Sequence, residues 1–201
     1  MKEIGMKKTW LGLGMAVLLV CPGWAQELAP HQKWIEQVDG GFVFPASSAA
    51  AAGYGMGVGG DILIGYRFTR QFSLSADLGY YDCDQKISGA LAGEWLYTPI
   101  MAVGRFSFGP GWVKPFVSLG VGFAMNTYSL TVAGIKTSVK ETDFLLAPGA
   151  GVLFIVTDHM ALYGQVRLDM NYTTVGSMGN PFTDNPTLFI PFKGGMSFFV
   201  L

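Results

Sequence analysis

Residues 160–173 alternate between two kinds of side chain, and this alternation constrains the fold more than any other feature of the chain. The even-numbered positions are apolar, small or aromatic, namely Met160, Leu162, Gly164, Val166, Leu168, Met170 and Tyr172. The odd-numbered positions include Gln165, Arg167, Asp169 and Asn171. A period of two predicts a β-strand, because successive side chains point to opposite faces of a sheet.

The length of this strand separates two kinds of β-protein. Strands of soluble proteins usually have about 5 or 6 residues, whereas this alternation continues for longer and recurs along the chain. It fits a sheet with one face toward lipid and the other toward a lumen. A soluble β-sandwich, with Arg167 and Asp169 in water, is the main alternative.

If the sheet spans a membrane, Val166→Arg on the lipid face should destabilise the protein more than Ala161→Arg on the lumen face.

The first 25 residues have the pattern of a secretory signal peptide. Lys2, Lys7 and Lys8 form a basic start, an apolar stretch covers 11–20, and small residues end at Ala25. The apolar stretch is too short for a membrane-spanning helix, which needs about 20 residues. A lipoprotein signal at Cys21 is a further alternative.

We therefore expect the mature protein to start at Gln26. Mass spectrometry of membrane-extracted protein should find a chain that lacks residues 1–25, because the signal is cleaved on export. A mass that retains Met1 to Ala25 contradicts this prediction, and a diacylglyceryl group on Cys21 supports the lipoprotein alternative.

The charge and cysteine content of the mature chain narrow the function classes. Cleavage leaves 10 basic and 13 acidic residues, so the composition does not predict binding to nucleic acid. Cys83 would be its single cysteine, so no intramolecular disulfide is expected. Half of the chain is hydrophobic, yet no later run could span a membrane as a helix. A closed β-barrel is the other structure that satisfies every backbone group in lipid.

Alternation predicts eight strands in residues 26–201, at 34–44, 55–68, 72–82, 95–108, 116–128, 143–156, 160–173 and 188–201. In the first strand, Glu36 interrupts an apolar face. Tight turns are expected at 69–71, 109–112 and 157–159, and longer loops at 45–54, 83–94, 129–140 and 174–187. Short turns at one end and long loops at the other are typical of outer-membrane barrels, with the turns in the periplasm. The predicted fold is an all-β, eight-stranded antiparallel up-and-down transmembrane β-barrel.

Aromatic residues and prolines lead to two further expectations. Two interfacial girdles are expected, one near the turns (Tyr66, Phe68, Phe72, Phe106, Phe108 and Trp112) and one near the loops (Tyr80, Trp95, Tyr128 and Tyr172). Pro99, Pro148 and Pro191 fall inside predicted strands. Proline has no N–H to donate to a neighbouring strand, and the sequence leaves open how these prolines are accommodated, with bulges or early strand ends as candidates.

The C-terminal segment resembles the assembly signal of outer-membrane barrels. A polar Lys193 precedes Gly195, followed in alternation by Phe198 and Val200, although Leu201 adds one residue. With Gly-Tyr-Arg-Phe at 65–68, the chain resembles the small eight-stranded outer-membrane barrels of the OmpA transmembrane-domain and OmpX type. The resemblance implies a bacterial outer-membrane location, contact with outer-membrane lipids and lipopolysaccharide, assembly by the barrel-assembly machinery, and an extracellular ligand bound through the loops.

Motifs that would indicate catalysis or a cofactor are weak. The glycines of 55–60 match G-x-G-x-x-G, but a dinucleotide site requires a following helix, and alternation continues instead. His31 and His159 lack metal-ligand spacing. A lipid A-modifying enzyme would need a Ser, a His and a carboxylate grouped near the membrane surface, and the loop end lacks histidine. We therefore expect no metal, no cofactor and no catalysis.

Six charged residues are expected to face the lumen at similar heights, with Arg105 slightly lower: Asp61, Asp77, Arg105, Arg167, Asp169 and Lys193. These three carboxylates and three cations should pair, because an unpaired buried charge is costly. The lumen of eight strands is only wide enough for side chains, so the favoured interpretation is a plugged lumen. Inward glycines are expected to leave room for water or a small cavity toward the loop end: Gly55, Gly57, Gly59, Gly120, Gly122, Gly149 and Gly151.

The sequence therefore favours a non-enzymatic outer-membrane barrel with a structural or surface-interaction role, in envelope integrity or adhesion. A narrow channel or carrier for small solutes is the first alternative, and a lipid A-modifying enzyme is the second.

Overall fold

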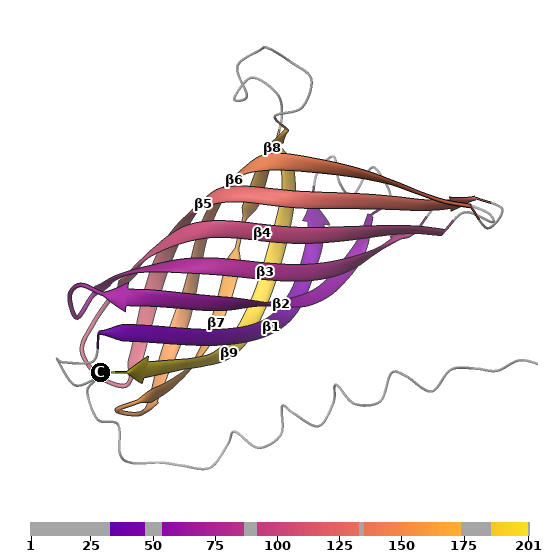
Figure 1. Ribbon diagram of the computed structural model, residues 1–201. Helices are drawn as coiled ribbons and strands as arrows, with labels where there is room; N and C mark the ends of the chain where they lie inside the picture. The colour runs from indigo at the N-terminus through magenta and orange to yellow at the C-terminus, as the bar shows by residue number, and fades with distance from the viewer. Residues whose placement is uncertain (1–32, 47–53, 87–91, 133–134, 174–185, 201) are drawn as a thin grey trace, which may run out of the picture.

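The computed structural model describes residues 33–46, 54–86, 92–132, 135–173 and 186–200. These residues form nine antiparallel strand segments: β1 (Trp34–Ala46), β2 (Tyr54–Arg67), β3 (Phe72–Lys86), β4 (Ala92–Ser107), β5 (Val113–Val132), β6 (Ile135–Thr157), β7 (Met160–Arg167), β8 (Asp169–Thr173) and β9 (Thr187–Val200). From β1 to β7 each strand pairs with the next in sequence, β8 pairs with β6 and β9 as β7 does, and β1 also pairs with β9. The sheet therefore closes into a barrel (Figure 1).

The segments β7 and β8 make up one strand of an eight-membered ring, as the alternation of 160–173 predicts. Leu168 separates the two segments and lies beside Pro148 of β6, whose carbonyl accepts a hydrogen bond from the Leu168 N–H at 2.8 Å. Pro148 has no N–H to return, so the ladder lacks one bond at this point. The predicted eight-stranded up-and-down topology is confirmed.

The structure shows how the three strand prolines are accommodated. Pro99, Pro148 and Pro191 lie within β4, β6 and β9, and the strands continue past them. Each proline pairs in the ladder on one side, while a few pairings are missing from the ladder on its other side. The register is the same before and after each gap. The prolines are therefore accommodated by missing ladder pairings and not by bulges or early strand ends.

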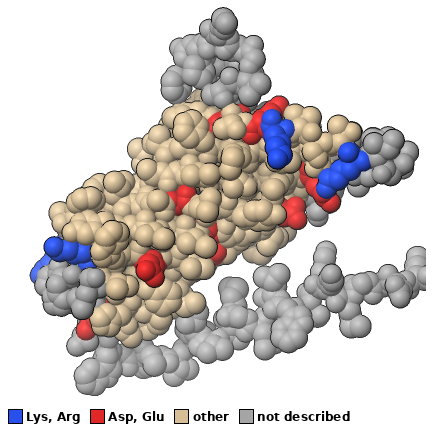
Figure 2. All heavy atoms as spheres, in the orientation of Figure 1, with Lys and Arg blue, Asp and Glu red and all other residues tan. Residues whose placement is uncertain are grey.

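The two faces of the barrel wall differ as the alternation predicts. In β7, Ala161, Tyr163, Gln165 and Arg167 are buried in the lumen, whereas Val166 on the other face is 43% exposed. The outer face carries a long series of exposed apolar side chains, including Ile62, Leu78, Leu119 and Phe192. On the face shown in Figure 2 the middle of the molecule is largely uncharged, with a few acidic atoms, and the Lys and Arg side chains lie toward its two ends. An apolar exterior of this kind suits contact with lipid.

The segment predicted as a loop at 129–140 is instead the end of a long hairpin. β5 and β6 remain paired in register from Phe123 and Phe144 to Val132 and Ile135. Ser129 and Ser138 hydrogen-bond across the hairpin at 2.9 Å, and Lys136 reaches Glu94 at 2.6 Å. Threonine and valine are frequent in this segment and favour extended structure. β4 pairs with β5 as far as Thr131, so β3, β4, β5 and β6 extend together at the loop end (Figure 1).

The predicted tight turns join β2 to β3, β4 to β5 and β6 to β7, as expected. Gly109 and Gly111 have φ values of 76° and 101°, a backbone conformation that glycine adopts readily. In the first turn, the Thr69 hydroxyl oxygen accepts a hydrogen bond from the Phe72 N–H at 2.9 Å. These turns and the C-terminal end of β9 lie at the same end of the barrel (Figure 1).

The aromatic girdle is confirmed at the turn end and partly wrong at the loop end. Phe68, Phe72, Phe108 and Trp112 are exposed on the outer face near the turns. At the loop end Tyr80 is exposed, but Trp95 is fully buried in the lumen and Tyr128 stacks against it. Trp95 and Arg105 are both odd-numbered positions of β4, and Arg105 was expected to face inward. The alternation therefore places both side chains in the lumen.

None of the described segments is a helix long and apolar enough to cross a membrane.

Candidate functional site: a charged layer between two apolar clusters in the lumen

The lumen contains an apolar cluster on each side of a polar layer. The loop-end cluster is built around Trp95, Tyr81, Tyr97, Met101 and Phe189. Trp95 stacks on Phe189 with 4.4 Å between ring centroids, and its Nε1 donates a hydrogen bond to Asn126 Oδ1 at 3.0 Å. Cys83, whose role the sequence leaves open, is buried in the same cluster.

The second cluster lies toward the turn end and includes Phe116, Tyr163, Leu153, Ala161 and Phe199. Ala161 is fully buried here, which corrects the expectation that Ala161→Arg is the milder substitution when compared with Val166→Arg. Ala161→Arg would force a long charged side chain into an apolar cluster, so it is not a mild substitution. Ala161 does face the lumen as predicted, but this part of the lumen is packed.

The inward glycines do not leave the loop side of the lumen open. A Cβ on Gly57 would lie 2.2 Å from Cys83 Sγ, and one on Gly120 would lie 2.5 Å from Met101 Sδ. Larger side chains from neighbouring strands therefore fill the space that the glycines provide. The expected cavity at the loop end is wrong for the described residues, because small and large side chains interlock across the barrel.

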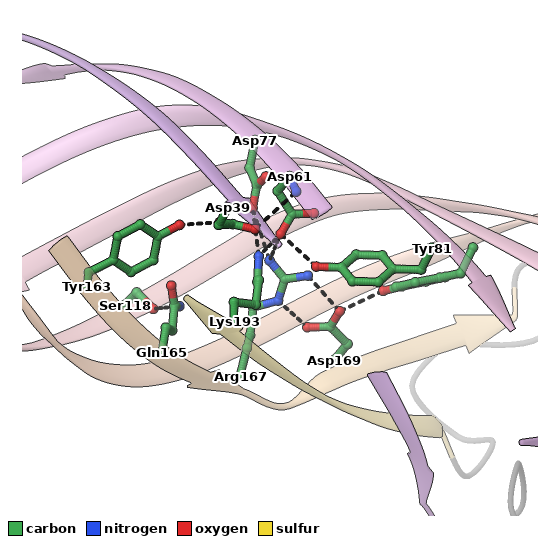
Figure 3. Close-up of polar contacts among 11 residues, drawn as sticks. Asp39, Asp61, Asp77, Tyr81, Ser118, Tyr163, Gln165, Arg167, Asp169 and Lys193 are labelled. Atoms are coloured by element: carbon green, nitrogen blue, oxygen red, sulfur yellow. Dashed lines mark hydrogen bonds and ion pairs between the residues drawn. The ribbon is translucent and has the colours of Figure 1, made fainter. Parts of the chain in front are cut away.

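Four buried carboxylates form the acidic part of the polar layer (Figure 3). Asp39, Asp61 and Asp77 come from β1, β2 and β3, and Asp169 comes from β8. Asp39 lies directly opposite Asp61 in the ladder, and the Asp61 N–H donates a hydrogen bond to Asp39 Oδ1 at 3.0 Å. Like charges in opposite positions repel, so this layer requires cations.

Arg167 supplies one of these cations from the end of β7. Its guanidinium is held by Asp169 through two contacts, Nε to Oδ1 at 2.5 Å and Nη2 to Oδ2 at 2.8 Å. Its Nη1 donates to Asp77 Oδ2 at 3.0 Å and lies 3.9 Å from Asp61 Oδ2. The planar guanidinium therefore joins acids that come from opposite ends of the chain.

Lys193 of β9 supplies the second cation. Its ammonium forms an ion pair with Asp61 and lies 3.8 Å from Asp77 Oδ2. Lys193 is paired with Gly41 of β1 in the ladder, and Asp61 lies one strand further on. The Lys193 side chain thus reaches past β1 to contact an acid on β2.

Three tyrosines hydrogen-bond the acids from either side of the layer. Tyr81 donates to Asp61 Oδ2 at 2.9 Å, Tyr97 donates to Asp169 Oδ2 at 2.8 Å, and Tyr163 donates to Asp39. Tyr81 and Tyr97 belong to the loop-end cluster and Tyr163 to the turn-end cluster. The hydroxyls therefore join the apolar clusters to the charged layer.

Two glycines provide the space that the acids occupy. A Cβ on Gly79 would lie 1.9 Å from Asp61 Oδ1, and one on Gly195 would lie 2.7 Å from Asp39 Cα. Gly195 belongs to the C-terminal motif that includes Phe198 and Val200, both of which face outward and are exposed. Leu201 lies outside the described residues.

The structure brings five of the six expected lumen charges together and separates Arg105 from them. Asp61, Asp77, Arg167, Asp169 and Lys193 lie within one network of contacts. Among the described residues Arg105 makes no ion pair; its guanidinium packs on the rings of Phe116 and Tyr163 at 4.4 and 5.6 Å. It lies nearer the turn end, where the apolar cluster separates it from the acids.

Asp39 and the three tyrosines were missed in the sequence. Asp39 follows Ile35 and Gln37 at a spacing of two, and all three are buried in the lumen. This alternation could have identified Asp39, but Glu36 and the short apolar face obscured it. Glu36 is exposed on the outer face.

Tyr97→Phe tests the hydrogen bonds between the tyrosines and the acids. Removing the hydroxyl leaves an oxygen of buried Asp169 without this donor, so we expect a loss of about 1–3 kcal/mol in the free energy of unfolding. Tyr80→Phe is the matched control, because Tyr80 is 58% exposed on the outer face. Urea unfolding in lipid vesicles measures both variants. Equal stabilities would show that the Tyr97 hydroxyl contributes nothing to the layer.

The described residues contain no group of three or more His, Cys, Asp or Glu side chains arranged to hold a metal ion. Asp61, Asp77 and Asp169 are held by Arg167 and Lys193 instead. His159 lies in the β6–β7 turn, with its Nδ1 3.4 Å from the carbonyl oxygen of Phe199. His31 lies outside the described residues.

A closed antiparallel ring with an apolar exterior and a polar layer inside defines a transmembrane β-barrel. Residues 14–188 match the model of the outer membrane protein beta-barrel domain family. The chain belongs to this family, and its location is the bacterial outer membrane. A search of the curated proteins found no match.

Solved structures of small outer-membrane barrels share the fold. Neisserial surface protein A has 19% identity and a TM-score of 0.59, with 88% of this chain and 99% of that chain covered. OprG from Pseudomonas aeruginosa has 13% identity and a TM-score of 0.57, with 87% and 98% covered. Ail, the attachment invasion locus protein of Yersinia pestis, has 14% identity and a TM-score of 0.52, with 83% and 95% covered.

Proposed function

We propose that the protein is a non-enzymatic surface protein of the outer membrane, with a lumen plugged by charged side chains. The observation that carries the proposal is the network of Asp39, Asp61, Asp77, Arg167, Asp169 and Lys193 between two apolar clusters. Eight strands leave a lumen only just wide enough for side chains. A solute would have to displace both clusters and the paired charges to pass.

The β5–β6 hairpin supports a role at the cell surface. Together with β3 and β4, which run beside it as far as Thr131, it forms a long extension at the loop end (Figure 1). This end faces the outside in barrels of this class. Ail has been crystallised in complex with the heparin analogue sucrose octasulfate. In this chain the cation Lys136 is paired with Glu94 at 2.6 Å. We therefore propose contact with an extracellular surface, but we do not propose a heparin-like polyanion as the ligand of this chain.

Conductance in planar lipid bilayers tests the plug. We expect the purified protein to show conductance near zero, both as wild type and as Arg167→Ala, because the two apolar clusters remain in place. Steady conductance in the wild type would favour the narrow channel or carrier. A large new conductance in Arg167→Ala alone would favour a gated channel.

A shortened hairpin tests the surface role. Ser129 and Ser138 lie opposite each other, so a two-residue Asn-Gly turn can replace residues 130–137. We expect a folded barrel whose cells adhere less to extracellular matrix and to one another than wild-type cells. Lys140→Ala, which keeps the hairpin length, serves as the control. Unchanged adhesion of the shortened variant would contradict the role of the hairpin.

A further inference from the structure

Arg105 is buried at the turn end of the lumen without a carboxylate partner among the described residues. It is 8% exposed, and its Nε has no hydrogen-bond partner. Its guanidinium packs over the ring of Phe116 at 4.4 Å. A ring face attracts a cation, but it leaves the N–H groups at the edge of the guanidinium unsatisfied.

Arg105 lines a small cleft that other basic residues also line. The cleft has a volume of about 30 Å³, and its lining includes Arg105, Arg67, Arg70 and Lys114 together with Ser73 and Ser107. No acidic residue is among the described residues that line it. Figure 2 shows Lys and Arg side chains at this end of the molecule.

The register of the wall explains why cations and hydroxyls meet there. Ser73 of β3 lies opposite Arg67 of β2 on one side and opposite Arg105 of β4 on the other. Arg105 in turn lies opposite Ser118 of β5. The row therefore alternates cation, hydroxyl, cation and hydroxyl on four adjacent strands. Ser73 thus lies between two cations, and its hydroxyl can donate a hydrogen bond to an anion held there, whereas the Ser118 hydroxyl accepts a hydrogen bond from Gln165 at 2.9 Å.

We propose that this cleft is a binding site for a phosphate group at the periplasmic mouth of the barrel. The guanidinium edge of Arg105 can hold two oxygens of a phosphate, and the hydroxyl of Ser73 can donate to a third. A carboxylate has only two oxygens and would leave one of these donors unused. The small volume admits only part of the anionic group, whose oxygens would face Arg105 from the open side. The ligand is therefore inorganic phosphate, a phosphate ester or the headgroup of an anionic lipid, and its remainder stays outside.

Isothermal titration calorimetry of the detergent-solubilised full protein tests the site. Sodium phosphate, glycerol phosphate and sodium acetate are compared at constant ionic strength, with sodium chloride as the blank. We expect saturable phosphate binding at one site and at least tenfold weaker acetate binding. Glycerol phosphate and micelles doped with phosphatidylglycerol then distinguish a soluble ester from a lipid headgroup.

Three variants connect the binding to the cleft. Arg105→Met should weaken phosphate binding at least tenfold, and Arg105→Lys should weaken it less, because the charge remains but the paired donors are lost. Lys140→Met at the loop end should bind phosphate as wild type does. The heat-dependent gel shift of a folded barrel verifies each variant, and Arg105→Lys carries the test if Arg105→Met does not fold. Wild-type affinity in both Arg105 variants, or equal binding of acetate and phosphate, would overturn the proposal.

Discussion

Arg167→Ala should lower the free energy of unfolding by about 3–5 kcal/mol, because it removes one partner of a fully buried ion-pair network. Asp169 would lose both guanidinium contacts and Asp77 would lose one at 3.0 Å. Urea titration in lipid vesicles, followed by tryptophan fluorescence, measures the loss. Lys140→Ala, an exposed cation at the loop end, should change stability little.

A double mutant identifies the source of that loss. Arg167→Ala combined with Asp169→Asn should regain part of the stability, because the orphaned charge of Asp169 is then absent. The recovery should be incomplete, since Asp77 still lacks its contact with Arg167. If the two single losses simply add, the two residues are not coupled and the proposed pairing is refuted.

Val166→Arg should cost roughly 2–4 kcal/mol, because Val166 faces lipid near the middle of the membrane. Val139→Arg is the matched control. Val139 is also an exposed valine, 53% against 43%, but it lies on the part of the β5–β6 hairpin that projects at the loop end. The same vesicle unfolding assay compares them. Similar losses in both variants would show that the membrane does not surround Val166.

Much of the barrel follows from a single physical rule that is visible in the sequence. Side chains in a strand alternate between two faces, and a transmembrane wall presents lipid to one face and the lumen to the other. That rule located the strands and placed Arg167, Asp169 and Asp61 inside. Applied consistently, it would also have placed Trp95 and Asp39 inside, but the preference of tryptophan for membrane interfaces and the outward Glu36 obscured the pattern.

Other features depend on distances across the barrel, which alternation does not encode. The three tyrosine hydroxyls reach their acids from neighbouring strands or across the lumen, as Tyr97 does from β4 to Asp169 on β8. The separation of Arg105 from the acids depends on the packing of Phe116 and Tyr163 beneath it. Likewise, the pairing that turns residues 129–140 into a hairpin depends on cross-strand register.

The positions of the paired charges along the chain have a consequence for assembly. Asp39, Asp61 and Asp77 lie on the first three strands, whereas Arg167 and Lys193 lie on the last two strands of the ring. A partly assembled barrel that contains only the early strands therefore carries these acids without the cations that neutralise them. Neutralisation is completed only when β9 docks beside β1. The electrostatic gain is thus concentrated at the closing step, which favours the complete ring in its correct register over partly assembled sheets.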